Sequence, residues 1–355
     1  MTSQISTSGA GRGDTGPAPT ARLASAQLDT GGTRRELLPW VIFLASFGMF
    51  PVLFTSTYAH NLGVLVCLTA IMALGWNLLG GFAGQISLGH ALFFGIGAYA
   101  AAVGGDILEV NPWLSIIAGM VLAVILSSLI GIPIFRLRGH YFAITTIAIA
   151  EIALIVFLNW SWVGGATGLS IPLQPDSLVN LQWSGRQRWE YYYLTLGIVI
   201  AILIATRFIL RSRIGYYLIA IREDQAAAAA LGVPVTRYKQ FAFGFSAAAV
   251  ALAGGLFAQY VLFVDPRSTF GLIISVNIII AAVIGGVRSM WGPIIGAVVF
   301  YTLTEFTRLQ FGGTGNALNL VFYGLLVMAI AAFEPNGLVG LGARFRRLML
   351  HWRSR

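Results

Sequence analysis

Two acidic residues fall inside long apolar stretches of this 355-residue chain and are the first candidates for chemistry. Glu305 stands three residues before Arg308, so an interfacial ion pair at helical spacing explains it better than a functional role. Glu151 lies near the middle of the stretch 141–158, which has no basic residue beside it. A carboxylate at the centre of a bilayer costs on the order of 3 kcal/mol, so Glu151 must face protein or water. It is either a structural group that joins two helices or part of a transport path.

A second set of polar side chains lies among closely spaced glycines between residues 75 and 97. Glycine at this density weakens a continuous helix and suits a discontinuous segment whose freed backbone groups line a cavity. A half-helix starting near Ser87 would point its positive end inward, where a substrate carboxylate is stabilised. The alternative interpretation is that the glycines serve close packing and that the histidine is a buried structural residue. The candidates for a translocation path are Asn77, Gln85, Ser87, His90, Thr145 and Glu151.

The usual residue patterns of an enzyme are missing from the sequence. The four histidines are far apart, and neither an HExxH motif nor paired aspartates occur. The single cysteine, Cys67, can form neither an internal disulfide nor a metal cluster. Since there is also no phosphate-binding GxxxxGK(S/T) loop, the chain is not expected to hydrolyse ATP alone. We expect no enzyme activity, no metal site and no directly bound cofactor.

The composition indicates the elements that must position these residues. Hydrophobic residues make up 57% of the chain and charged residues 10%, against roughly 25% charged in soluble domains. Ten apolar segments approach the ~20 residues that a helix needs to cross a bilayer. Their cores are 37–54, 62–79, 87–103, 113–135, 141–158, 191–210, 241–264, 272–284, 291–309 and 318–333. The predicted fold class is an all-α polytopic membrane protein with about ten transmembrane helices, some short or discontinuous.

The positions of the arginines predict the orientation, because short cytoplasmic loops collect Lys and Arg. With the N-terminus inside, 18 of the 22 Lys and Arg residues lie on the cytoplasmic side. The net charge of +9 then reflects loops beside an anionic inner leaflet, and no nucleic-acid partner is needed to explain it. Residues 1–36 are predicted to be a disordered cytoplasmic tail and 336–355 a basic cytoplasmic tail, with the transmembrane domain at 37–335 between them.

Two connections between the apolar segments are too long to be simple turns. The external loop at about 159–190 carries four tryptophans, typical of an interfacial aromatic belt, and glycines and a proline that suit a shaped surface. In the cytoplasmic connection at about 211–240, the pattern predicts one short helix over 219–231, ended by Gly232 and Pro234. That helix is too short and polar to cross a membrane. It either rests on the headgroups as an amphipathic linker or docks in a groove of a partner subunit.

At this connection the sequence resembles a known family. EDQAAAAALGV at 223–233 and the following TRYK are similar to the coupling loop of M-type permeases of branched-chain amino acid ABC transporters. The resemblance continues, in family order, over nearly everything after residue 37. It is carried by LGWNLLGGFAGQISLGHALFFGIGAYAAA (74–102), LRGHYFAITTIAIAEI (137–152), GGATGLSIP (164–172), GGVRSMWGPIIGA (285–297) and FEPNGLVG (333–340). Arg288 departs from the pattern, because members often have glycine there. Arg288 either loosens the cytoplasmic hairpin that contains it or serves as a further anchor at the inner leaflet or as an ATPase contact.

The resemblance implies the transmembrane subunit of an ATP-driven importer of branched-chain or other hydrophobic amino acids, in the bacterial inner membrane with both termini cytoplasmic. The implied partners are an H-type permease, two ABC ATPase subunits that use ATP and magnesium, and an extracytoplasmic solute-binding protein. The residues expected to couple to the ATPases are Ile221, Arg222, Glu223, Asp224, Gln225, Ala226, Leu231 and Gly232. The runner-up is an importer of urea, short amides or aromatic acids in the same superfamily. A different class, a self-sufficient channel or proton-coupled carrier with Glu151 as relay, is the further alternative.

Overall fold

The computed structural model describes residues 33–137, 139–183, 189–311, 321, 324–325 and 337–340. The chain divides after Phe50 into two compact units, and the first holds most of helix α2 (Thr33–Leu53). The second unit begins at Pro51 and contains the remaining elements discussed below. Most of the two predicted tails, and the predicted segment 318–333 apart from three residues, lie outside the described part of the chain.

The second unit is built almost wholly from helices, which confirms the all-α class. Six stretches of the described chain are long and apolar enough to cross a membrane, and two shorter apolar helices occur at Pro39–Leu53 and Gly292–Phe306. The longer elements of this unit are α3 (Thr57–Asn77), α4 (His90–Asp106), α5 (Pro112–Ile134), α6 (His140–Asn159), α7 (Trp189–Arg211), α10 (Val235–Val261), α12 (Leu272–Gly285) and α13 (Gly292–Phe311). The short helical elements are η1 (Leu78–Phe82), η2 (Ser161–Val163), η3 (Gly165–Thr167), α8 (Arg213–Glu223), α9 (Gln225–Ala230) and α11 (Pro266–Phe270).

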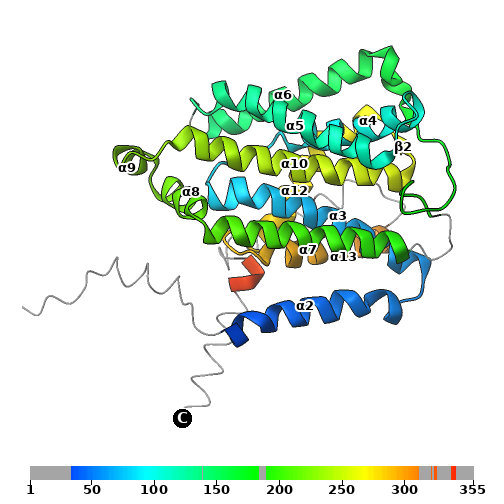
Figure 1. Cartoon of the computed structure of the whole chain (residues 1–355), viewed down its shortest axis with the longest axis horizontal. Coiled ribbons are helices and arrows are strands. Elements are labelled where there is room, and N and C mark those ends of the chain that lie inside the picture. Colours follow the sequence, from blue (N-terminus) through cyan, green and yellow to red (C-terminus); the bar gives the residue numbers. More distant parts are fainter. Residues whose placement is uncertain are drawn as a thin grey trace, which may run out of the picture. The chain divides into compact units, whose positions relative to one another are not determined.

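Helices α4 and α10 form the core of this unit, with α3 and α5 packed against α10 (Figure 1). Their contact depends on glycine. A Cβ atom at Gly97 would lie 1.9 Å from the carbonyl oxygen of Ala251, and one at Gly254 would lie 2.1 Å from that of Phe94. The two backbones therefore touch directly, as small residues permit in membrane helix pairs. Nearly every residue of α4 is buried as a result.

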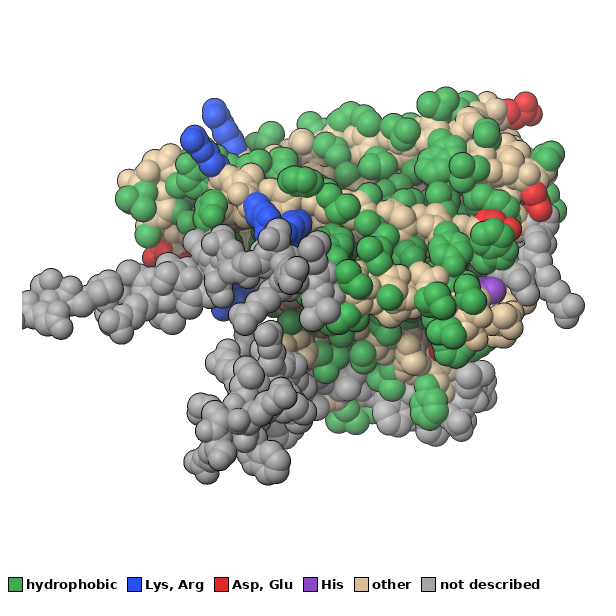
Figure 2. Space-filling model, turned by 60° about the horizontal axis from the view of Figure 1, so that its bottom comes forward, with side chains coloured by type: hydrophobic (Ala, Val, Ile, Leu, Met, Phe, Trp, Pro, Cys, Tyr) green, Lys and Arg blue, Asp and Glu red, His purple; other side chains and the backbone are tan. Residues whose placement is uncertain are grey.

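The peripheral helices α5, α6 and α7 leave wide apolar faces uncovered. Only 17% of the apolar window of α6 is buried, against 89% for the stretch Thr57–Phe82. Figure 2 shows hydrophobic side chains over the middle of one face, with Lys and Arg side chains gathered towards the end that carries α8 and α9. An apolar band with charges near its ends is the surface of a protein that spans a bilayer.

The loops discussed here gather at two ends of the second unit (Figure 1). At one end the external loop pairs with the connection after α10, because β1 (Leu169–Ser170) runs antiparallel to β2 (Phe263–Val264). The indole N–H of Trp113 also donates to the carbonyl oxygen of Leu178 in this loop, at 2.9 Å. The end opposite carries α8, α9 and the turn before α13. These contacts hold the described part of the external loop, residues 159–183, in a defined conformation at this end.

Candidate coupling and translocation site

The connection 211–240, predicted to be cytoplasmic and here called the coupling loop, contains two helices and not the single helix predicted over 219–231. Helix α8 ends at Glu223 and α9 begins at Gln225, because Asp224 adopts extended geometry with φ −153° and ψ 109°. Its carboxylate accepts hydrogen bonds from the backbone N–H groups of Ala226 at 2.7 Å and Ala227 at 3.0 Å. This N-cap outcompetes helix continuation, so the prediction of one helix was wrong. The predicted end before Gly232, whose φ is +82°, is confirmed.

The two N–H groups that bind the Asp224 carboxylate also set its charge. The hydrogen bonds from Ala227 and Ala226 hold the pKa of Asp224 below its usual value. The carboxylate is therefore ionised near neutral pH, and both of its N–H contacts lie within the loop. Asp224 shapes the joint between α8 and α9, in addition to being exposed where a partner could contact it.

The coupling loop combines buried anchors with an exposed tip. Leu218, Ile221 and Ala228 are buried and hold α8 and α9 against the rest of the protein. The other candidates predicted to meet the ATPases point outward to differing degrees. Leu231, at the tip, is 86% exposed, and Glu223 is exposed as well. Arg222 and Gln225 are half-buried, while Ala226 and Gly232 are exposed.

Lys239 ties the coupling loop to the helix bundle. It lies in the second turn of α10 with only 2% of its surface exposed, although it carries a charge. Its Nζ donates to Oε1 of Gln225 at 2.6 Å, and the same Nζ lies 5.9 Å from the ring centre of Phe135 at the end of α5. One side chain therefore connects α9, α10 and the α5 end. Sequence reasoning did not select Lys239, although a lone lysine just before an apolar segment was a usable signal.

Arg222 connects the coupling loop to the chain after η1. Its side chain lies across Gly84, where a Cβ atom would stand 2.9 Å from Cγ of Arg222 and where φ is +70°. Burial lowers the pKa of Arg222, the charge of Arg288 lowers it further, and Glu223 acts in the opposite direction. Arg288, the residue that departs from the family pattern, therefore lies near the coupling loop and is exposed. Its turn is held by a 3.0 Å hydrogen bond from Nδ2 of Asn77 to the carbonyl oxygen of Ser289.

The glycine-rich stretch between η1 and α4 is not helical, as predicted for a discontinuous segment, and α4 begins at His90, three residues after Ser87. Hydroxyl groups from three other helices meet its start. Nε2 of His90 is 2.8 Å from Oγ of Ser246, the N–H of Ala91 donates to Ser275 at 2.8 Å, and that of Leu88 donates to Thr146 at 3.0 Å. The polar junction, as we call it, comprises Ser87, His90, Thr146, Ser246 and Ser275, all of them buried. It joins α4 to α6, α10 and α12.

The structure brings some of the predicted path residues together and separates others. Ser87 and His90 lie in the polar junction, and Asn77 is buried at the end of α3. Gln85 and Thr145 are half-buried, and the Thr145 hydroxyl donates to the carbonyl oxygen of Tyr141 at 2.8 Å. Glu151 stands apart, exposed on α6.

Three hydroxyl partners in the polar junction were not found from the sequence. They are Thr146, Ser246 and Ser275. Ser246 and Ser275 carry no local signal of their contacts, and Thr146 was passed over for its neighbour Thr145. Glu305 accepts a 3.4 Å hydrogen bond from the hydroxyl of Tyr58, whereas the side chain of its predicted partner Arg308 lies outside the described residues.

The fold and these sites define a multi-pass membrane protein with an anchored helical loop beyond its apolar band. The chain belongs to the family described as branched-chain amino acid transport system / permease component, whose model matches residues 58–331. The high-affinity branched-chain amino acid transport system permease protein LivM of Salmonella typhimurium is 31% identical over 302 residues, which cover 79% of this chain and 69% of that protein. LivM of Escherichia coli is 29% identical over 331 residues, or 87% of this chain and 76% of the relative.

Permeases of the H type are also similar to this chain. LivH of Salmonella typhimurium is 28% identical over 288 residues, which cover 76% of this chain and 91% of the relative. No solved structure matches the chain. The family consists of transport permeases, so the protein is a transport component and not an enzyme.

Proposed function

We propose that this chain is the membrane-spanning subunit of an ATP-driven importer of branched-chain or other hydrophobic amino acids. The observation that carries the proposal is the coupling loop, which is fixed to the bundle by buried residues while Leu231 and Glu223 stay exposed. A leucine exposed at the end of a short helix outside the apolar band suits a partner's groove. The permease relatives, named as components of transport systems, support an energy source on other subunits.

In this proposal, ATP and magnesium are used by two separate ATPase subunits. Their closure moves α9, and the Gln225–Lys239 hydrogen bond carries the movement to α10. Helix α10 in turn touches α4 backbone to backbone through Gly254. Since packed interfaces shift between discrete arrangements, such a movement switches the path between its two openings. We expect this movement to open and close the transport path at the polar junction, which includes His90 at the start of α4.

The second membrane-spanning partner is an H-type permease. Similarity to both LivM and LivH supports pairing of two subunits with related folds. The outer face of α6, defined by Ile144, Ala148, Glu151, Ile152 and Ile155, is the surface we assign to that contact. Glu151 lies about 2 Å along the axis from the middle of the 20-residue α6. A carboxylate that faces lipid at that depth has a high free-energy cost. The second permease therefore either covers Glu151 or forms, together with it, the wall of the transport path.

An extracytoplasmic solute-binding protein delivers the amino acid, and most selectivity resides there. The binding protein docks on the end of the permease that carries β1 and β2. The permease itself lies in the inner membrane with both termini on the cytoplasmic side. Weak contacts within the permease favour release on the other side, since a tight site would retain the cargo.

Uptake in proteoliposomes tests the proposal. The complete assembly, with both permeases, the ATPases and the binding protein, is expected to accumulate labelled leucine only when ATP is supplied to the side of the coupling loop. The purified chain alone, reconstituted at equal density, is expected to transport none. Leucine uptake by the chain alone would show a self-sufficient carrier and overturn the proposal.

A further inference from the structure

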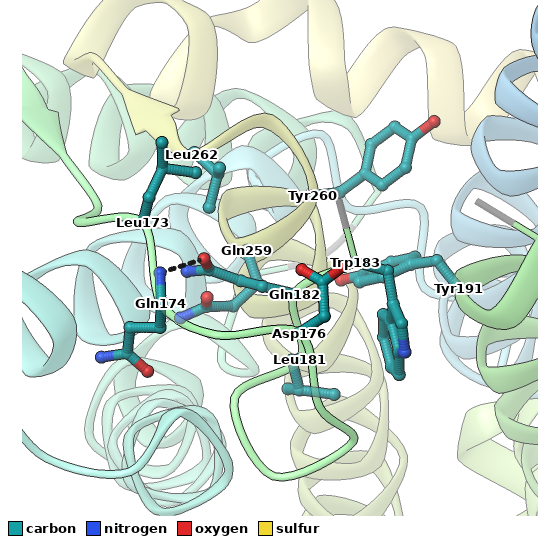
Figure 3. A pocket seen from close by; sticks show the side chains of 10 residues that line it. All are labelled: Leu173, Gln174, Asp176, Leu181, Gln182, Trp183, Tyr191, Gln259, Tyr260 and Leu262. Atoms are coloured by element: carbon teal, nitrogen blue, oxygen red, sulfur yellow. Dashed lines mark hydrogen bonds between the residues drawn. The ribbon is translucent and has the colours of Figure 1, made fainter. Parts of the chain in front are cut away.

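A small cavity lies at the end of the second unit that carries the external loop (Figure 3). Its volume is about 140 Å³, and its walls come from the external loop, the start of α7 and the end of α10. The apolar wall is made by Leu173, Leu181, Trp183 and Leu262, and Asp176 and Gln259 add polar groups. Sites for drug-sized ligands run from about 300 Å³ upward, so this cavity takes only a small molecule.

Gln259 is the unusual residue of this cavity. It is 2% exposed, yet neither Oε1 nor Nε2 of its amide has a hydrogen-bond partner in the structure as described. A buried amide without partners is rare in folded proteins and calls for an explanation such as a bound group. Figure 3 shows its amide beside that of Gln182 in the cavity wall. Gln259 is therefore a residue of the cavity wall whose amide N–H groups and oxygen are not satisfied by the described protein groups.

The other polar groups of the wall have partners and hold its shape. Oε1 of Gln182 accepts from the backbone N–H of Gln174 at 2.8 Å, and its Nε2 donates to the carbonyl oxygen of Pro172 at 3.0 Å. The Tyr191 hydroxyl donates to the carbonyl oxygen of Leu256 at 2.5 Å. These bonds, with the pairing of β1 and β2, fix the external loop over α10. The cavity is thus preformed, and Gln259 stands out within it.

We propose that this cavity binds a small zwitterionic amino acid with an apolar side chain, as the first site on the permease after delivery. The Gln259 amide donates to the ligand's carboxylate and accepts from its ammonium group, and the carboxylate of Asp176 places negative charge on the ammonium side. The leucines and Trp183 contact the apolar side chain. The proposal rests on the function proposed above and adds a ligand site to it. Its position on α10 links it to coupling, since Lys239 lies twenty residues earlier, roughly 30 Å along the same helix.

Ligand binding to the assembled transporter without its solute-binding protein tests this site. In nanodiscs, leucine is expected to bind saturably and to raise the unfolding temperature of the complex. Gln259→Met keeps the side-chain volume and removes both hydrogen-bonding atoms, so leucine affinity should fall at least tenfold. The unfolding temperature of the free variant should not fall, because the amide has no protein partner to lose. Leu178→Met in the same loop is the control, since its exposed side chain does not line the cavity, and it should bind leucine as the wild type does.

Two analogues test the zwitterion. 4-Methylpentanoate is leucine without its ammonium group and isoamylamine is leucine without its carboxylate, so each should bind at least tenfold more weakly than leucine. Unchanged leucine affinity in Gln259→Met, or absence of leucine binding to the wild type, would mean that the cavity holds water only and would overturn the site. If ATP-driven leucine uptake persists in that case, the proposed function stands and only this inference fails. If the complete assembly takes up no amino acid, the proposed function itself is wrong.

Discussion

Lys239 shows how one side chain can join the coupling loop to the membrane helices. A lysine that is almost fully buried must be compensated, and Gln225 and the Phe135 ring lie around its Nζ. Removal of the ammonium group removes the hydrogen bond between α10 and α9 without touching the exposed tip. A substitution of Lys239 therefore tests the transmission of movement from α9 to α10 separately from the docking of a partner on the exposed tip.

Lys239→Met is expected to lower leucine uptake at least tenfold in the complete assembly while ATP hydrolysis continues, because the link from α9 to α10 is lost. The assay measures uptake and phosphate release on the same proteoliposomes. Arg237→Met is the matched control, since Arg237 is exposed two residues away on α10, and its uptake should stay near that of the wild type. Normal uptake in Lys239→Met would place the transmission elsewhere.

Asp224 has a structural role that its exposed position conceals. Asparagine caps helices about as well as aspartate, whereas alanine does not. Asp224→Asn should therefore retain most uptake, and Asp224→Ala should reduce it severalfold as α9 loses its first turn. Circular dichroism cannot isolate so short a helix, so protection of the amides of 225–230 from hydrogen exchange is the structural measurement. Equal loss in both variants would mean that the negative charge itself contacts a partner.

At the scale of elements, the contact of α4 with α10 relies on the absence of side chains. Gly254→Ala puts a methyl group 2.1 Å from the carbonyl oxygen of Phe94, so the helices must move apart. Overpacking of this kind typically costs 1–3 kcal/mol, and a clear fall in the unfolding temperature is expected. Gly244→Ala on the same helix is the control, because its nearest neighbour would be 3.7 Å away. Equal unfolding temperatures for the two variants would contradict the close packing described.

The sequence predicted the long elements well because each is an apolar stretch near the length of a bilayer crossing. Helices α5 and α6, for instance, begin and end within about two residues of their predicted cores. The joint at Asp224 was missed because alanine-rich sequence favours a continuous helix, and only the side-chain cap reverses that preference. The partners of His90 and the isolation of Gln259 could not be predicted, since both depend on segments distant in the chain.

At the scale of the whole molecule, the uncovered face of α6 predicts an assembly. The chain has a single cysteine, the buried Cys67, so a photo-reactive amino acid is the simpler probe of this face. Placed at Ile155, it should cross-link to the H-type permease and give a band at the summed mass. The same probe at Phe208, which is exposed on α7, should not. Cross-linking from Phe208 and none from Ile155 would reassign the interface.

The central claim is that separate ATPases drive this chain through the tip of its coupling loop. The most direct measurement is the number of leucine molecules imported per ATP hydrolysed when the exposed Leu231 is replaced by serine in the complete assembly. Loss of one well-packed anchor costs about 2 kcal/mol or more, so import per ATP should fall at least tenfold. Leu137→Ser, an exposed leucine just beyond α5 and outside the coupling loop, should leave the ratio unchanged. An unchanged ratio in Leu231→Ser would contradict the account.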